Sequence, residues 1–289
     1  MRGFWADERI DGKIWRLNNP VYRSIYNYFK RKEKQFLQES DAIISLTENG
    51  KKEILTWTDL NIPSAKITII PCCADLSHFS LKSLDDQKVE IIRQETQIKE
   101  KDFVLSYLGS VGTWYLLDEM LQFFKRLLLV KTSARFLFIT PDDKSIIMEA
   151  AKRLAIDVNK LIVLEAKRED IPAYISLSTI SIFFIKPAYS KKASSPTKMG
   201  EIMGLGITVI TNSGVGDVDG IIEKTGAGAL VKDFTNSHFD SAIEQIDDLL
   251  KIEKSRITSV AKEYFSLEMG VEKYSEVYGK LMHEIKTTP

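Results

Sequence analysis

The sequence contains few residues of the kinds that build disulfide scaffolds, metal sites or membrane spans. Its two cysteines, Cys72 and Cys73, are adjacent in a chain of 289 residues, so a disulfide between them would need unusual geometry. Two cysteines do not make a zinc site, and the three histidines are scattered along the chain. No apolar run approaches the roughly 20 residues that cross a bilayer. We therefore expect a protein of a reducing, cytoplasmic setting that holds no metal ion.

An excess of charge of one sign is missing as well. The 40 Lys and Arg residues balance the 40 Asp and Glu residues, so no field over the whole molecule would attract nucleic acid. The first residues, MRGFWADERIDG, lack the basic, apolar and small-residue order of a signal peptide. The remaining composition, 44% apolar and 28% charged, is typical of a globular protein, and the length favours two cores.

The C-terminal part of the sequence alternates regularly between apolar strands and amphipathic helices. Strands are expected at residues 103–109, 135–140, 161–165, 180–185, 207–211 and 227–231. The intervals between them leave room for one crossover helix each, as parallel strands require. The pattern predicts an α/β fold in which residues 101–250 form one complete, doubly wound, Rossmann-like domain.

The N-terminal part is less regular. It contains only two convincing strands, at residues 41–47 and 66–71. Because two parallel strands make a poor sheet by themselves, residues 1–76 are predicted to be a partial α/β domain that either packs on the second domain or lacks its beginning. The charge-rich residues 77–100 are predicted to be a linker. Residues 251–289 are predicted to be C-terminal helices that pack back on the N-terminal part.

Ligands of open α/β sheets bind beyond the carboxyl ends of the strands, so the loops at those ends matter most. The sequence GSVGT follows the first strand of the C-terminal domain and precedes a helix. Gly109 and Gly112 would let backbone N–H groups approach a phosphate. A tight turn in which Thr113 caps the next helix explains the same residues, and both interpretations stay open.

A second loop, SSPTK, leads into a helix that contains Glu201. Pro196 suits the first helical turn, and Ser194 or Ser195 would cap the helix. The N–H groups at the helix start and the Lys198 ammonium would then form an anion site. Glu201 would either accept hydrogen bonds from a vicinal diol such as a ribose or simply face the helix dipole, and local physics leaves these alternatives nearly even.

Three further segments have more ordinary explanations. Asp217, which follows the strand at 207–211, would cap the next helix. Residues 167–170 would form a solvated loop, although a nucleobase could also lie against them. An aromatic stripe with neighbouring basic residues on a helix at 21–38 would be a packing surface or would rest on an anionic membrane.

The order of these parts resembles the retaining glycosyltransferases of family 4, the group 1 transferases of the GT-B fold. The matching segments are ITIIPCCADLSHF, GSVGT, SSPTKMGEIMGLGITVITNSGVGD and AGALV. They lie between residues 40 and 285, and the stretch 194–217 is the most specific of them. The resemblance implies two Rossmann-like domains that face each other across a cleft, with a nucleotide sugar bound mainly to the C-terminal one.

The resemblance also implies a donor site. In it the glycine-rich loop lies against the diphosphate, residues 195–198 lie near the sugar and the diphosphate, Glu201 binds the ribose, and residues 165–167 lie near the base. The donor-binding residues of this site are Gly109, Ser110, Gly112, Thr113, Glu165, Lys167, Ser195, Pro196, Thr197, Lys198 and Glu201. No metal ion, other cofactor or side-chain nucleophile is implied.

Two departures from the family pattern concern this site. Ala193 stands where the first glutamate of the family's E-x7-E element would contact the donor sugar, in an S-P-T-K variant that some members share. Ser110 and Tyr115 stand where an Arg and a Lys normally clamp the diphosphate. Because charge develops on the leaving diphosphate, Lys198 is the candidate for the missing positive charge.

These features predict a retaining glycosyltransferase that moves a sugar from a nucleotide diphosphate sugar to a glycan or lipid-linked acceptor, in cell-surface polysaccharide synthesis. It would act in the cytoplasm or peripherally at the inner membrane face. The family's first domain is normally larger, so the sequence is expected to be N-terminally truncated and to need the missing half. The alternative is a non-catalytic nucleotide-sugar-binding relative or an inactive fragment.

Overall fold

The computed structural model describes residues 3–287, with side chains to residue 283. It contains a six-stranded and a two-stranded sheet, both parallel. The strands are β1 (Ile43–Ser45), β2 (Ile67–Ile69), β3 (Val104–Leu108), β4 (Arg135–Ile139), β5 (Leu161–Leu164), β6 (Ile180–Phe183), β7 (Val209–Asn212) and β8 (Gly228–Val231). The helices are α1 (Trp5–Asp11), α2 (Pro20–Glu39), α3 (Glu48–Leu55), α4 (Asp86–Thr96), α5 (Leu117–Leu127), α6 (Lys144–Arg153), α7 (Ile171–Ser176), α8 (Thr197–Gly204), α9 (Val218–Thr225), α10 (Asn236–Glu244), α11 (Ile246–Leu249), α12 (Lys254–Phe265) and α13 (Leu267–Thr287).

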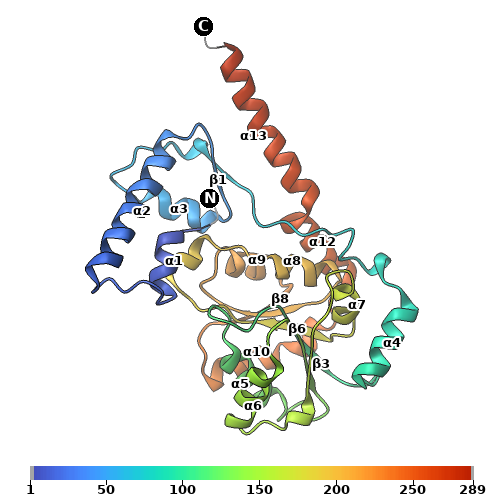
Figure 1. The fold of residues 1–289 in the computed structure, drawn as a ribbon. Coiled ribbons are helices and arrows are strands. Elements are labelled where there is room, and N and C mark those ends of the chain that lie inside the picture. The colour runs from blue at the N-terminus through green and yellow to red at the C-terminus, as the bar shows by residue number, and fades with distance from the viewer. Residues whose placement is uncertain (1–2, 288–289) are drawn as a thin grey trace.

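The large sheet has the strand order β5-β4-β3-β6-β7-β8. Numbered within this sheet, that is the order 3-2-1-4-5-6 of a Rossmann domain, so the predicted doubly wound fold is confirmed. Its strands β3, β6 and β7 are buried along their whole length, because α8 and α9 cover one face and α5, α6 and α10 cover the other (Figure 1). The strand order reverses between β3 and β6, which places the loops after these strands at the crevice where such sheets bind ligands.

The small unit is built around β1, β2 and α1 to α3 (Figure 1). Its buried cluster contains Phe4, Leu37, Ile43, Ile54 and Ile67. The sixth member is the alanine at position 193, which comes from η4, a 3-10 helix of the large unit that spans Tyr189–Ala193. The core of the small unit is therefore completed by the large one.

A polar clamp, formed by Asp217 and Asn49, joins the two units beside this cluster. The Asp217 carboxylate accepts hydrogen bonds from the backbone N–H of Glu48 (2.6 Å) and of Asn49 (3.0 Å), at the start of α3. The Asn49 side chain donates to the Gly216 carbonyl in return. The prediction that Asp217 caps the helix after it is wrong, because Thr47 caps only the third N–H of α3 and leaves the first two for Asp217.

The aromatic stripe of α2 packs in part against α1. The Tyr26 hydroxyl donates to Asp7 at 2.8 Å, and the Lys30 ammonium pairs with the same carboxylate at 2.7 Å. The Phe29 ring lies 4.9 Å from the Trp5 ring, centroid to centroid. Packing therefore explains this part of the stripe, and contact with a membrane stays a prediction. Within residues 3–287 no helix is long and apolar enough to cross a membrane.

The segments on either side of the large sheet also contact the rest of the chain. Between the units, α4 contributes Ile92 to the main hydrophobic core. At the C-terminal end, α12 packs on α8, and Ser266 forms a parallel bridge with Ala74. The first turns of α13 contact the small unit, where Lys273 Nζ donates to the Ile69 carbonyl, and the rest of the helix projects away from the body (Figure 1).

Candidate functional site

A pocket of about 820 Å³ opens beyond the carboxyl ends of β3 and β6. It is lined by the end of β3, the segment from η4 into α8, the loop after β5, and α1 of the small unit. Six of the predicted donor-binding residues line it: Gly109, Ser195, Pro196, Thr197, Lys198 and Glu201. The other five do not line it: Ser110, Gly112, Thr113, Glu165 and Lys167.

The N-terminus of α8 faces this pocket without a side-chain cap. The helix begins at Thr197, with Pro196 at the N-cap position. The predicted capping by Ser194 or Ser195 is wrong, because the Ser195 hydroxyl instead accepts a hydrogen bond from Cys72 N (3.1 Å) of the small unit. The first N–H groups of α8 and the positive end of its dipole are therefore available to an anion.

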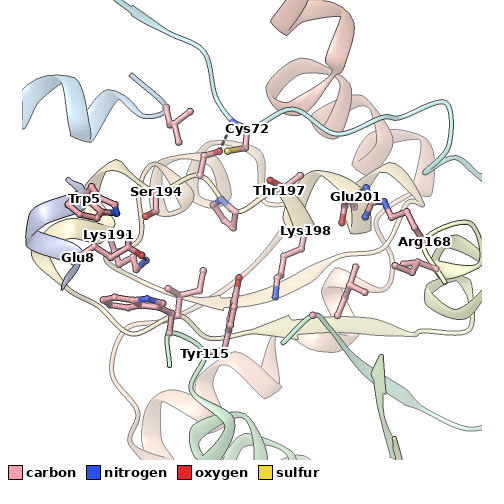
Figure 2. Close-up of a pocket in the computed structure, with 18 of the residues that line it drawn as sticks. Trp5, Glu8, Cys72, Tyr115, Arg168, Lys191, Ser194, Thr197, Lys198 and Glu201 are labelled. Atoms are coloured by element: carbon pink, nitrogen blue, oxygen red, sulfur yellow. Dashed lines mark hydrogen bonds and ion pairs between the residues drawn. The ribbon is translucent and has the colours of Figure 1, made fainter. Parts of the chain in front are cut away.

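Lys198 lies at the middle of the pocket on α8 (Figure 2). Its ammonium stands over the Tyr115 ring at 3.7 Å and over the Tyr107 ring at 4.6 Å from the centroids. Among the described residues no carboxylate lies within ion-pair distance of Nζ. Burial lowers the pKa of Lys198 to about 7, although the nearby Glu201 charge acts in the opposite direction. The site thus holds a cation that lacks an anion.

Gly109 makes room for this ammonium. A Cβ added at Gly109 would lie 2.9 Å from Lys198 Nζ, and the backbone φ of +116° is one that L side chains rarely adopt. The backbone conformation therefore favours glycine here, and any side chain would also push the flexible Lys198 ammonium from its present position.

The rest of the glycine-rich loop is engaged elsewhere. The Ser110 hydroxyl donates to the Asp142 carboxylate at 2.7 Å, and the same carboxylate accepts from Val111 N. An internal acid thus occupies N–H and O–H groups that were expected to face a phosphate. The predicted cap at Thr113 is also not formed, because α5 begins only at Leu117 and has no side-chain cap.

Glu201 lies at one end of the pocket, next to Arg168 (Figure 2). It is 5% exposed, and its Oε1 accepts a hydrogen bond from Arg168 Nη2 at 2.5 Å. The Arg168 guanidinium also stacks over the Phe79 ring at 4.7 Å. Arg168 lies in a solvated loop, as predicted, with its side chain 60% exposed, but its guanidinium also contacts Glu201 and lines the pocket. The signal in the sequence was the position of residues 167–170 after a strand of the sheet, where a nucleobase could lie against them.

The opposite end of the pocket is built from both units. Here Trp5, Glu8 and Arg9 of α1 meet Lys191 of η4 and Trp114 of the loop after β3. The Lys191 ammonium is buried, pairs with Glu8 Oε1 at 2.9 Å, and lies 3.8 Å from the centroid of the Trp114 ring. No sequence motif predicts this end, because its members come from three segments that lie more than 70 residues apart in the chain.

A family model described as "Glycosyl transferases group 1" matches residues 88–261, which is more than half of the chain. The chain therefore belongs to the group 1 glycosyltransferases, which confirms that part of the resemblance, while family 4 and the retaining mechanism stay predictions. No curated protein matches the chain.

Solved structures of glycosyltransferases share the fold. A glycosyltransferase from Rickettsia africae is similar with a TM-score of 0.70 and 17% identity, covering 89% of this chain and 67% of that one. WaaG, a glycosyltransferase involved in lipopolysaccharide biosynthesis, has a TM-score of 0.70 and 15% identity, with 91% and 69% covered. HepE from Anabaena, solved in complex with UDP-glucose, has a TM-score of 0.65 and 13% identity, with 86% and 67% covered. The chain spans about two thirds of the length of each.

Proposed function

We propose that this chain binds a nucleotide diphosphate sugar and transfers the sugar, with retention of configuration, to a glycan or lipid-linked acceptor in cell-surface polysaccharide synthesis. One observation carries the proposal. The uncapped start of α8, the unpaired Lys198 ammonium and the Glu201 carboxylate all line one pocket at the switch point of a Rossmann-like sheet. Proteins similar in fold include one solved with UDP-glucose and one involved in lipopolysaccharide biosynthesis.

The diphosphate would lie between the start of α8 and Lys198. As the bond from the sugar C1 to the phosphate oxygen breaks, negative charge builds on the diphosphate, and preorganised donors there lower the barrier. The helix N–H groups and the ammonium are such donors. Because burial lowers the pKa of Lys198 to about 7, a bound diphosphate would restore its proton as it binds.

Glu201 would bind the ribose. One of its oxygens is held by Arg168, which fixes the carboxylate at the end of the pocket. The other oxygen would accept a hydrogen bond from a ribose hydroxyl, and a charged acceptor makes such a bond stronger than a neutral one. The Arg168 guanidinium, rather than the predicted Glu165 and Lys167, would then lie nearest the base.

The transfer step needs no nucleophile from the protein. The acceptor hydroxyl would attack C1 from the side that the diphosphate leaves, and its proton would pass to the leaving phosphate oxygen. Among the side chains that the structure describes, no three His, Cys, Asp or Glu cluster as metal ligands would. Transfer without a metal or other cofactor stays a prediction.

A non-catalytic nucleotide-sugar-binding protein is the second candidate. It is favoured by the Asp142 carboxylate, which occupies Ser110 and Val111 in the loop that would contact the diphosphate. In this case the site would bind a donor without turning it over.

The deciding experiment exposes the purified chain to UDP- and GDP-sugars, with and without glycan acceptors. Nucleotide release and the anomeric configuration of the product are followed by NMR. We expect release of nucleoside diphosphate with retained configuration, lost in Lys198→Met and reduced in Glu201→Gln. Binding without turnover would support the second candidate, and no binding of any nucleotide would contradict both.

A further inference from the structure

Position 193 cannot reach a ligand in the pocket. Ala193 is 2% exposed and packs in the apolar cluster of the small unit with Phe4 and Ile54. A Cβ added at Gly50 would lie 2.9 Å from the Ala193 Cβ, so the α3 backbone rests directly on this methyl group. A carboxylate at this position would have to enter the apolar cluster, at a high desolvation cost. If the sugar end of the pocket has an acidic contact, another residue must supply it.

Glu8 is placed to supply that contact. Among the described residues, the carboxylates that line the pocket are Glu8 and Glu201, and they lie toward opposite ends of it, with Lys198 between them (Figure 2). With the ribose at Glu201 and the diphosphate at Lys198, the sugar of the donor would extend toward Glu8.

The Glu8 carboxylate is also held in place. Its Oε1 accepts from the buried Lys191 ammonium, which the Trp114 ring covers from one side. Its Oε2 has no hydrogen bond to the described residues and stays available to a ligand. Trp5, one turn before it on α1, is 43% exposed and lines the same end, where its ring offers an apolar face to the C–H groups of a pyranose.

We propose that Glu8, positioned by Lys191, binds the hydroxyl groups of the transferred sugar from across the cleft between the two units, in place of the carboxylate absent at position 193. This inference rests on the proposed donor site. It makes Glu8 a specificity-determining residue for the sugar, with no part in binding the nucleotide.

A neighbouring ion pair provides a matched control. Glu53 of α3 pairs with Lys192 of η4 at 2.8 Å, just as Glu8 of α1 pairs with Lys191 at 2.9 Å. Both pairs join the small unit to η4, but neither Glu53 nor Lys192 lines the pocket. Glu8→Gln and Glu53→Gln therefore remove the same kind of contact between the units, and only the first alters the pocket.

The test measures two dissociation constants for each variant by titration calorimetry. The nucleotide sugar is chosen first, as the one among UDP-glucose, UDP-galactose and GDP-mannose that binds the wild type most tightly. One dissociation constant is measured for this nucleotide sugar, and the other for its free nucleoside diphosphate. We expect Glu8→Gln to weaken the nucleotide sugar about tenfold, the loss typical of a hydrogen bond to a charged group, and to leave the free diphosphate unchanged. Glu8→Asp keeps the charge on a shorter side chain, so its dissociation constant for the nucleotide sugar should lie between those of the wild type and Glu8→Gln. Glu53→Gln should have the same two dissociation constants as the wild type.

Two results would overturn the inference alone. Equal dissociation constants for the nucleotide sugar in Glu8→Gln and wild type would show that no sugar contact is made. An equal loss for sugar and free diphosphate would show that Glu8 only shapes the pocket. If neither ligand binds the wild type, the proposed function itself fails and this inference falls with it.

Discussion

The two units of the molecule are stabilised in different ways. The six-stranded sheet is buried on both faces, in a continuous core that runs from Phe79 to Phe265. The buried cluster of the small unit contains five hydrophobic residues of its own and a sixth, Ala193, that comes from the large unit. Small cores of this kind are marginal by themselves. The position of the small unit therefore depends on η4 and on the polar clamp of Asp217 and Asn49.

The two ends of the pocket reflect this difference. The end with Glu201, Arg168 and Lys198 belongs wholly to the large unit, whereas the end with Trp5 and Glu8 needs the small unit in place. Changes that disturb the large unit's end should affect every nucleotide. Changes that loosen the small unit should weaken only the binding of the sugar, which is the part of the donor that extends beyond the diphosphate.

The largest effect is expected from removing the buried cation at the large unit's end. Lys198→Met should weaken nucleoside diphosphate binding by about 100-fold, because a charged hydrogen-bond donor to the phosphates is lost. The melting temperature should stay equal or rise, since the empty site no longer holds an unpaired buried charge. Calorimetry and thermal unfolding measure the two effects. Lys192→Met, an exposed lysine six residues away, is the control and should leave affinity unchanged.

The pH should act on the same residue in two opposite directions. The pKa of Lys198 is lowered to about 7 in the folded protein. Above pH 7 the unfolded chain therefore binds more protons than the folded one. The free energy of unfolding of the ligand-free protein should thus increase as the pH rises from 7 toward the usual lysine pKa. Diphosphate binding needs the charged lysine, so affinity should fall over the same range, by up to about tenfold per pH unit. Parallel titrations of stability and affinity from neutral to alkaline pH test this. A flat affinity profile would rule out Lys198 as the phosphate ligand.

A methyl group at Gly109 should disturb Lys198 from the other side. Gly109→Ala must adopt an unfavourable φ and approach Nζ, so we expect a loss of about 1 kcal/mol in unfolding free energy and a several-fold weaker diphosphate complex. Gly220→Ala in α9 is the control, because nothing lies within 4 Å of its new Cβ. That variant should be neutral or stabilising by up to about 1 kcal/mol. Equal behaviour of the two variants would mean that Gly109 leaves no special room for the lysine.

The smallest effect is expected from opening the clamp between the units. Asp217→Ala removes the partner of two N–H groups at the start of α3 and should cost about 1 kcal/mol, as the loss of a helix cap does. Hydrogen exchange should quicken in α3, and nucleotide-sugar affinity should fall while that of the free diphosphate stays constant. Asp219→Ala, which breaks a bond to Gly214 inside the large unit, should leave exchange in α3 unchanged.

The sequence was sufficient for the large sheet and for part of the site. Continuous apolar runs at regular spacing predicted all six strands, and the glycine and proline loops marked which ends carry ligands. The contacts that decide the site were not predictable, because they join distant residues. Arg168 and Glu201 are hydrogen-bonded although 33 residues separate them in the sequence, and Asp142 and Val111 although 31 residues separate them.

Two of the wrong helix-cap predictions have the same cause. Ser195 and Asp217 were expected to cap the helices next to them in sequence. Each instead bonds to a backbone N–H of the small unit, at Cys72 in the first case and at the start of α3 in the second. Local rules describe what these side chains favour in isolation, and the docking of the two units replaced those partners with others.

The most direct test of the donor site is a calorimetric titration of UDP and GDP into the wild type and Lys198→Met at roughly pH 7.5, in two buffers that differ in ionisation enthalpy. The difference between the buffers gives the number of protons taken up on binding. We predict that one of the two nucleotides binds the wild type with net uptake of protons, up to the fraction of Lys198 that is neutral at this pH, and that Lys198→Met loses both the affinity and the uptake. Absence of binding, or binding without proton uptake, would contradict a site built around the buried cation of Lys198.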